Sequence, residues 1–304
     1  MKKSRILALL LALAMLASMA ACGAKNEAPA APSAPAEGNS NAAAPAVPAG
    51  DAHYAVDADT VVVCTADETP SVTARKHNAV AGSYINNLTY ETLIALDIDL
   101  VPQPCLAESY EYEEQADGSM LWTFHLRQGV KFHNGAELKS EDVVASFAEA
   151  KESPDVATYS KGYDNVTAVD DYTVTMTTAG PSAALLYDMA HHGNAIVPAE
   201  LLKNGHDFNV EPIGTGPYKL TEWKISESLA FDAHEDYWKG APAIKHVLWK
   251  IIPEGSARTI ALQAHEVDYV IELDSNDMNL VEEDNSLSLM VIDSVSHNWL
   301  SINN

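Results

Sequence analysis

The first fifty or so residues have a composition that cannot form a packed core, so the folded part of this chain must follow them. Residues 1–5 carry three basic side chains, and the next sixteen, Ile6 to Ala21, are apolar except for Ser18. This run is shorter than the roughly twenty apolar residues that a membrane-spanning helix needs, so residues 1–21 are predicted to be a signal peptide. Residues 22–55 are rich in Ala, Pro, Ser and Asn. They cannot bury enough apolar surface to offset their ordering entropy, so we expect a disordered tether there and a folded body over residues 56–304.

The junction between signal peptide and tether contains a cysteine. Met19-Ala20-Ala21-Cys22-Gly23 resembles the lipobox of bacterial lipoproteins. That resemblance implies cleavage before Cys22 and a lipid on its side chain, hence an extracytoplasmic protein held at the cell surface or in the periplasm by its lipid anchor alone. The alternative is a plain signal peptide in which Cys22 is a chance residue.

The net charge of the chain limits the kinds of partner it can bind, and its cysteines raise the question of a disulfide. The chain has 43 acidic and 18 basic residues, a formal net charge of −25. Such a surface repels phosphate backbones, so nucleic-acid binding is excluded as a working hypothesis. Cys64, in the apolar run from Thr60, is expected to be a buried thiol, although a disulfide between Cys64 and Cys105 in an oxidising compartment stays open.

The body mixes strand and helix patterns irregularly, which favours α/β or α+β organisation over a barrel or a bundle. Ser140 and Ser256 are predicted to cap two of the helices. The predicted strands are Thr60–Ala66, Leu121–Arg127, Thr173–Thr178 and Val247–Ile252, and the predicted helices are Tyr84–Ala95, Glu141–Glu152, Ala183–His191 and Ala257–His265.

Motifs of catalysis are missing from the sequence. It contains no GxSxG, HExxH, CxxC or Walker loop. Gly214-Thr215-Gly216 is followed by Pro217 and an extended pattern, which predicts a tight turn into a strand and not a phosphate loop. The adjacent pair His191-His192 would diverge by about 100° on a helix, which disfavours shared metal coordination. We therefore predict no catalytic residue, no metal ligand and no cofactor.

Five blocks, read together, are more informative than any single residue. The segment Leu121 to Gly135, continued by Leu138 and Glu141 to Val143, resembles the signature of bacterial extracellular solute-binding proteins of family 5. These are the oligopeptide-, dipeptide- and nickel-binding proteins of ABC importers. The other blocks that resemble this family are Tyr90-Glu91-Thr92-Leu93, Pro212 to Tyr218, Tyr237 to Pro242, and Arg258 with Ala261 to Gln263 and Glu266 to Asp268.

The resemblance implies an α/β, periplasmic-binding-protein-like fold of type II, in the cluster of the large peptide binders. A first lobe would comprise residues 56–92 and 187–304, with an inserted subdomain at residues 93–186. Family members continue into a second lobe, whereas this chain ends at Asn304. We therefore expect a chain truncated before that lobe, with only the first lobe and the inserted subdomain present.

By the same resemblance, the function is to capture oligopeptides, dipeptides or a related solute and to deliver them to an ABC permease and its ATPase. Ligand contacts are expected in loops after first-lobe strands, at Asp67, Glu68, Tyr84 and Asn87. A carboxylate there would meet the ammonium group of a peptide. The alternatives are a nickel or metal-chelate binder of the same family, a secreted hydrolase, and a structural lipoprotein.

Overall fold

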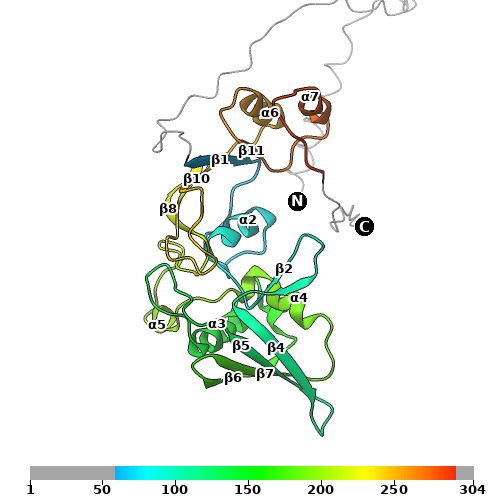
Figure 1. Cartoon of the computed structure of the whole chain (residues 1–304), viewed down its shortest axis with the longest axis vertical. Coiled ribbons are helices and arrows are strands. Elements are labelled where there is room, and N and C mark those ends of the chain that lie inside the picture. Colours follow the sequence, from blue (N-terminus) through cyan, green and yellow to red (C-terminus); the bar gives the residue numbers. More distant parts are fainter. Residues whose placement is uncertain (1–58, 292–304) are drawn as a thin grey trace, which may run out of the picture. The chain divides into compact units, whose positions relative to one another are not determined.

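The computed structural model describes residues 59–291. The predicted signal peptide (residues 1–21), Cys22 and the predicted tether (residues 22–55) lie outside the described residues. In the described part, the strands form a five-stranded sheet, a four-stranded sheet and a two-stranded ribbon, with short helices beside them (Figure 1).

The five-stranded sheet is mixed and has the order β11-β1-β10-β9-β8. Its strands are β1 (Thr60–Thr65), β8 (Tyr218–Lys224), β9 (Ser228–Ala233), β10 (His246–Ile251) and β11 (Tyr269–Val270). β1 runs parallel to both of its neighbours, β10 and β11, whereas β8, β9 and β10 pair antiparallel. The sheet is therefore complete only when β1, at the beginning of the described residues, pairs with β10 and β11 from much later in the chain.

β1 is an interior strand because its sequence supplies apolar side chains to both faces. Val62 and Cys64 pack with Ala261, and Val63 packs with Trp249 in a second cluster. Alternate residues of a strand point to opposite faces, so these clusters lie on the two sides of the sheet. Burying one valine stabilises the fold by about 1.5–3 kcal/mol. The carboxyl end of β1 leads through residues 66–79 to helix α2 (Val80–Thr89).

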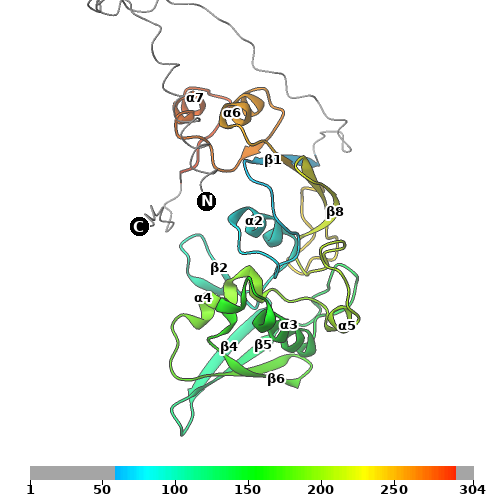
Figure 2. The same ribbon diagram turned by 180° about the vertical axis from the view of Figure 1, so that it is seen from behind.

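The four-stranded sheet is antiparallel, with the order β4-β5-β7-β6. Its strands are β4 (Ala107–Glu114), β5 (Met120–Leu126), β6 (Asp164–Asp170) and β7 (Thr173–Thr178). Burial alternates along β5, with Trp122, Phe124 and Leu126 buried, so these side chains form the apolar face of the predicted strand. Helix α3 (Ser140–Glu152) packs on that face against β6 and β7 (Figure 2).

The remaining elements connect and cover the sheets. They are β2 (Ile94–Leu96), β3 (Pro102–Pro104), η1 (Ala157–Ser160), α4 (Leu185–Ala190), η2 (His192–Asn194), α5 (Ala199–Lys203), α6 (Gly255–Gln263) and α7 (Met278–Glu282). The largest apolar cluster joins the four-stranded sheet to α3 and α4. Among residues 59–291, none of the helices has the length and apolarity that crossing a bilayer requires.

Three local predictions are wrong. The helix expected over Tyr84–Ala95 begins earlier and ends at Thr89, and its last residues form β2. Ser140 is the first residue of α3 and not its cap. The N-cap is Lys139, whose backbone N–H donates to the Asp142 carboxylate at 2.8 Å. Ser256 lies inside the first turn of α6, which begins at Gly255 without a side-chain cap.

Candidate functional site

The Gly214-Thr215-Gly216 turn packs directly on the end of α2. The backbone N–H of Gly216 donates to the carbonyl of Thr89 at 3.0 Å. A Cβ on Gly214 would overlap that same carbonyl oxygen, and one on Gly216 would come within 2.5 Å of the Leu88 carbonyl oxygen. Only glycine allows backbones to approach so closely. β8 follows this turn, which confirms the predicted turn into a strand.

Glu91, just past α2, holds three parts of the chain together. Its carboxylate accepts hydrogen bonds from Tyr237 Oη and Trp238 Nε1, both at 2.8 Å, and from Thr215 Oγ1 at 3.0 Å. The Lys239 ammonium lies 3.7 Å away, and the Glu91 side chain is only 9% exposed. Burial, followed by the Glu91 charge, raises the pKa of Tyr237, so this phenol stays a donor. Three of the five sequence blocks therefore meet at one carboxylate.

The fifth block plays a similar part at β1. Asp268 Oδ2 accepts from the backbone N–H of Val62 at 2.8 Å. The Arg258 guanidinium donates to the carbonyls of Ile252 and Pro253 at 2.8 and 3.0 Å. These side chains satisfy backbone groups where the sheet would otherwise leave them unpaired. These block residues therefore use their hydrogen bonds to hold the fold together.

Two of the predicted ligand contacts follow β1. The Asp67 side chain is exposed. Glu68 accepts from the backbone N–H and the hydroxyl of Ser226, at 2.7 and 2.9 Å, and from Trp223 Nε1 at 3.3 Å. The Glu68 carboxylate therefore holds the β8–β9 turn, whereas that of Asp67 is open to solvent.

The other two predicted contacts lie on α2. Tyr84 Oη donates to Glu272 Oε1 at 3.1 Å, and the Tyr84 ring stacks on Trp249. Asn87 is exposed and lines a hollow of about 390 Å³ beside Glu91 and His192. No hydrogen bond joins any two of the four predicted residues within residues 59–291, and their contact with a ligand stays a prediction.

A column of neighbouring rings, which was not predicted from the sequence, lies beside the start of α2. Tyr159 stacks on His191 with ring centroids 3.5 Å apart, His191 lies 4.1 Å from His192, and His192 lies 5.0 Å from His77. Asn78 completes the group, since its side chain binds both Tyr159 and His191 at 3.2 Å. We call these five residues the ring column. They come from the loop before α2, from η1 and from the α4–η2 junction.

The imidazoles of the ring column are held neutral. Burial, followed by the neighbouring His192, lowers the pKa of His77 to about 4 and that of His191 to about 3. Burial also lowers the pKa of His192. Each of the six ring nitrogens already faces a protein group. Within residues 59–291, no group of three or more His, Cys, Asp or Glu is arranged to hold a metal ion.

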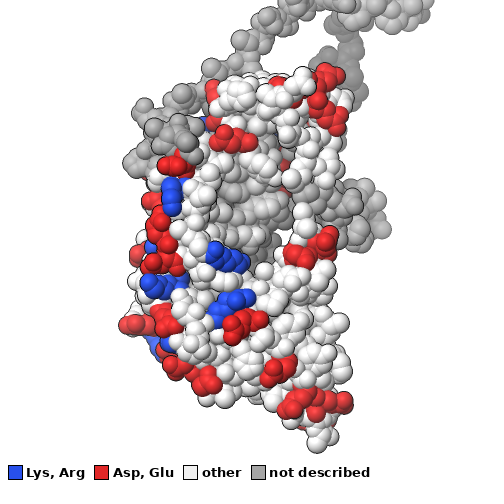
Figure 3. Space-filling view, viewed as in Figure 1, with Lys and Arg blue, Asp and Glu red and all other residues white. Residues whose placement is uncertain are grey.

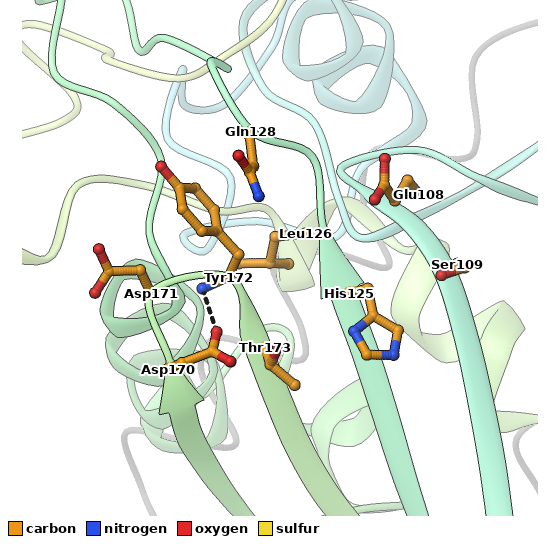
Figure 4. A pocket seen from close by; sticks show the side chains of 9 residues that line it. All are labelled: Glu108, Ser109, His125, Leu126, Gln128, Asp170, Asp171, Tyr172 and Thr173. Carbon is orange, nitrogen blue, oxygen red and sulfur yellow. Dashed lines mark hydrogen bonds between the residues drawn. The ribbon is translucent and has the colours of Figure 1, made fainter.

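A second hollow, of about 530 Å³, lies at one end of the four-stranded sheet (Figure 4). Ser109 and His125 face each other across β4 and β5 there. His125 Nε2 is directed at Glu111 at 3.3 Å, and no hydrogen bond within residues 59–291 joins it to Ser109. A nucleophile needs a base within hydrogen-bond reach. This Ser–His pair therefore lacks the geometry of a catalytic dyad.

The surface charge follows the sequence. On the face shown in Figure 3, acidic side chains outnumber basic ones and gather over the tip of the β4–β5 hairpin. The ring column gathers polar, uncharged groups and aromatic faces beside the start of α2, and His192 of this column also lines the hollow of about 390 Å³. Polar, uncharged groups beside aromatic faces are typical of sites that bind small solutes.

Known proteins share this architecture. Residues 101–304 match the bacterial extracellular solute-binding proteins, family 5, in the middle part of that family. The glutathione-binding protein GsiB of Salmonella paratyphi A is 28% identical over 270 residues, which cover 87% of this chain and 50% of that protein. The chain therefore belongs to family 5 of the bacterial extracellular solute-binding proteins, a family of transport proteins and not of enzymes.

Solved structures agree. The oligopeptide-binding protein AppA from Bacillus subtilis, in complex with a nonapeptide, is 27% identical with a TM-score of 0.66, covering 74% of this chain and 46% of that one. NikZ from Campylobacter jejuni, in complex with Ni(L-His), is 25% identical with a TM-score of 0.66, covering 76% and 46%. The fold is the predicted α/β fold of type II periplasmic binding proteins. The chain spans about half the length of the curated relatives it matches.

Proposed function

We propose that the protein captures peptides, or a related small solute, outside the cytoplasm and delivers them to the permease and ATPase of an ABC importer. Family membership supports the transport role. The ligands printed for relatives support the ligand class, since GsiB is named for glutathione and AppA is solved with a nonapeptide. No covalent step is needed in this role, because capture requires only burial of the solute against fixed hydrogen-bonding groups.

The ring column is the observation that carries this proposal. Its side chains present aromatic faces and hydrogen-bonding groups without a net charge, which suits a solute with many amide groups. Exposed Asp67 is proposed as the carboxylate that meets a peptide ammonium, and Asn87 as a contact from the neighbouring hollow. Direct contact of Glu68 and Tyr84 with the ligand remains a prediction.

We also propose that Cys22 is lipidated and becomes the first residue of the mature protein, which would anchor the binding body at the membrane. The support is the sequence Met19 to Cys22. Mass spectrometry of the mature N-terminus from a native host tests this. An unmodified Cys22, or cleavage at another bond, would contradict it.

Binding is tested by NMR titration of the chain with three probes: trialanine, reduced glutathione and nickel with L-histidine. Chemical-shift changes detect even millimolar affinity. We expect shifts of ring-column resonances with trialanine or glutathione. Shifts with the nickel probe alone would instead support the metal-chelate alternative. Turnover of peptide or ester substrates would support the hydrolase, and no binding of any probe would support the structural lipoprotein.

A further inference from the structure

A backbone amide sets the tautomer of His191. The N–H of Gly193 donates to His191 Nδ1 at 3.0 Å. Nδ1 must therefore carry a lone pair. Because the ring is neutral, its single proton lies on Nε2. The directions of the hydrogen bonds from His191 to Asn78 and from Asn78 to Tyr159 follow from this proton.

The proton on His191 Nε2 orients the Asn78 amide. Nε2 donates to Asn78 Oδ1 at 3.2 Å, so the amide oxygen points to the imidazole and the nitrogen points away from it. That nitrogen donates to Tyr159 Oη, also at 3.2 Å. The phenolic oxygen is thus an acceptor within the protein. Within residues 59–291, its own proton has no hydrogen-bond acceptor.

Tyr159 is held rigidly enough for its hydroxyl to have a defined direction. Its ring lies 3.5 Å from the His191 ring, nearly parallel to it. Its carbonyl accepts from Asn194 Nδ2 at 3.0 Å, and Asn194 is fully buried and bound in turn by Ser160 at 2.9 Å. A donor that is already positioned loses little entropy when it binds.

We propose that Tyr159 is the terminal donor of a one-way hydrogen-bond chain, Gly193 to His191 to Asn78 to Tyr159, and that it selects an oxygen acceptor of the ligand. The acceptor is a carbonyl or a carboxylate oxygen, and an ammonium group is disfavoured at this position. This inference rests on the proposed function and specifies the ligand group that this part of the site recognises. Polarisation along the chain strengthens the last donor.

Two substitutions test the direction of the chain. Tyr159→Phe keeps the ring stack and removes the donor. Asn78→Asp keeps an acceptor for His191 but must also accept the Tyr159 proton, which reverses the last bond. Each is expected to raise the Kd for trialanine about five-fold, the weight of one hydrogen bond. Tyr112→Phe, at an exposed tyrosine of β4, is the matched control and should leave Kd unchanged.

The double variant separates the hydrogen-bond chain from simple charge repulsion. If Asn78→Asp acts through the hydroxyl, it should have no further effect in the Tyr159→Phe background. If the new charge merely repels the peptide carboxylate, the two effects add. Additive effects, or a Tyr159→Phe Kd within two-fold of the unsubstituted chain, would overturn the proposal.

Two further readouts decide the remaining cases. Long-range proton–nitrogen correlation of labelled histidine should show the proton of His191 on Nε2, with His191→Gln providing the assignment. A proton on Nδ1 would overturn the inference whether or not a ligand is added. If the unsubstituted chain binds none of the peptide probes, the proposed function and the role of Tyr159 fail together. Binding with no effect of Tyr159→Phe refutes the role of Tyr159 alone.

Discussion

Replacing Glu91 by glutamine would weaken the junction of three chain segments without changing its size. The carboxylate accepts from Tyr237, Trp238 and Thr215 at 2.8 to 3.0 Å. All three groups donate to a charged acceptor in a nearly dry site. A glutamine amide offers only one oxygen and one NH2 group.

The best arrangement of the glutamine can be worked out from the donors. The Trp238 indole N–H can only donate, so the amide oxygen must stay where Oε2 lies, which also keeps the bond from Thr215. The NH2 group then faces Tyr237, whose hydroxyl must turn and accept. Three charge-assisted hydrogen bonds become neutral ones, and each change lowers the free energy of unfolding by about 1 kcal/mol. We expect Glu91→Gln to lower the free energy of unfolding by about 2–3 kcal/mol.

Glu91→Ala should cost more, about 4–5 kcal/mol, because it leaves partly buried donors without any acceptor. Urea denaturation followed by tryptophan fluorescence measures both values. Glu114→Gln, at an exposed position of β4, is the matched control and should stay within about 0.5 kcal/mol of the unsubstituted chain. A Glu91→Gln chain as stable as that control would refute the argument that this carboxylate joins the segments.

Three other outcomes are expected. Gly214→Ala should destabilise the chain by more than about 3 kcal/mol in the same urea assay, because its Cβ would overlap backbone, whereas Gly180→Ala, with no atom closer than 3.8 Å to its Cβ, should cost less than about 1 kcal/mol. Burial holds the pKa of His191 at about 3, below its value of about 6.5 in the unfolded chain. Its contribution to stability is therefore complete above about pH 6.5 and is lost as the pH falls toward 3, so His191→Gln should flatten the fall of Tm over that range. Burial raises the pKa of Cys105 to about 12, so this thiol should resist iodoacetamide at pH 8 in the folded chain and react after unfolding.

The fold was predictable where local pattern and tertiary environment agree. The predicted strands Thr60–Ala66 and Leu121–Arg127 agree with β1 and β5, whose apolar side chains are mostly buried. The expectation of a buried thiol at Cys64 is confirmed, and Cys105 is also free and buried. In each case one or both faces of a strand are buried, and the positions of the apolar residues in the sequence indicate which faces these are.

The end of α2 was not predictable from local pattern. Helical periodicity continues past Thr89, but the carbonyls of Leu88 and Thr89 are approached by the Gly214–Gly216 turn. Continuing the helix would use those carbonyls differently and would move Glu91 away from its partners. A contact with a turn far along the chain therefore decides where the helix stops.

The predicted cap at Ser140 failed for a similar reason. The Ser140 hydroxyl donates to the carbonyl of Asp170, at the β6–β7 turn, and is unavailable to its own helix. The Asp142 carboxylate is close enough to take over, and it also accepts from the backbone N–H of Ala199 at 2.7 Å. A serine before an acidic turn is a sound capping signal, but here a tertiary partner competes for it.

The ring column was missed because its members are far apart in sequence. His191 and His192 were weighed only as a metal pair, whereas their rings stack with Tyr159 and His77 from other segments. The usable signal was an adjacent histidine pair just after a predicted helix, followed by Gly193. His77 and Asn78 lie in the same loop as the predicted Asp67 and Glu68, ten residues further along the chain, and whether this loop contacts a ligand stays a prediction.

If block residues hold the fold and loop residues contact the solute, proteins of one family can bind unlike ligands. Glu91, the glycine turn and Arg258 use their hydrogen bonds within the protein itself, so exchanging them would damage the fold before it changed a ligand. Asn78 and Asp67 are exposed and lie in loops, where a substitution costs little stability and changes what is offered to a solute. One relative of this chain is named for glutathione, and two solved structures with a similar fold hold a nonapeptide and a nickel–histidine complex. The chemistry of the ligand should therefore be sought in the hydrogen-bond directions of the loops, and in this chain the Tyr159 hydroxyl is the group whose direction the structure defines.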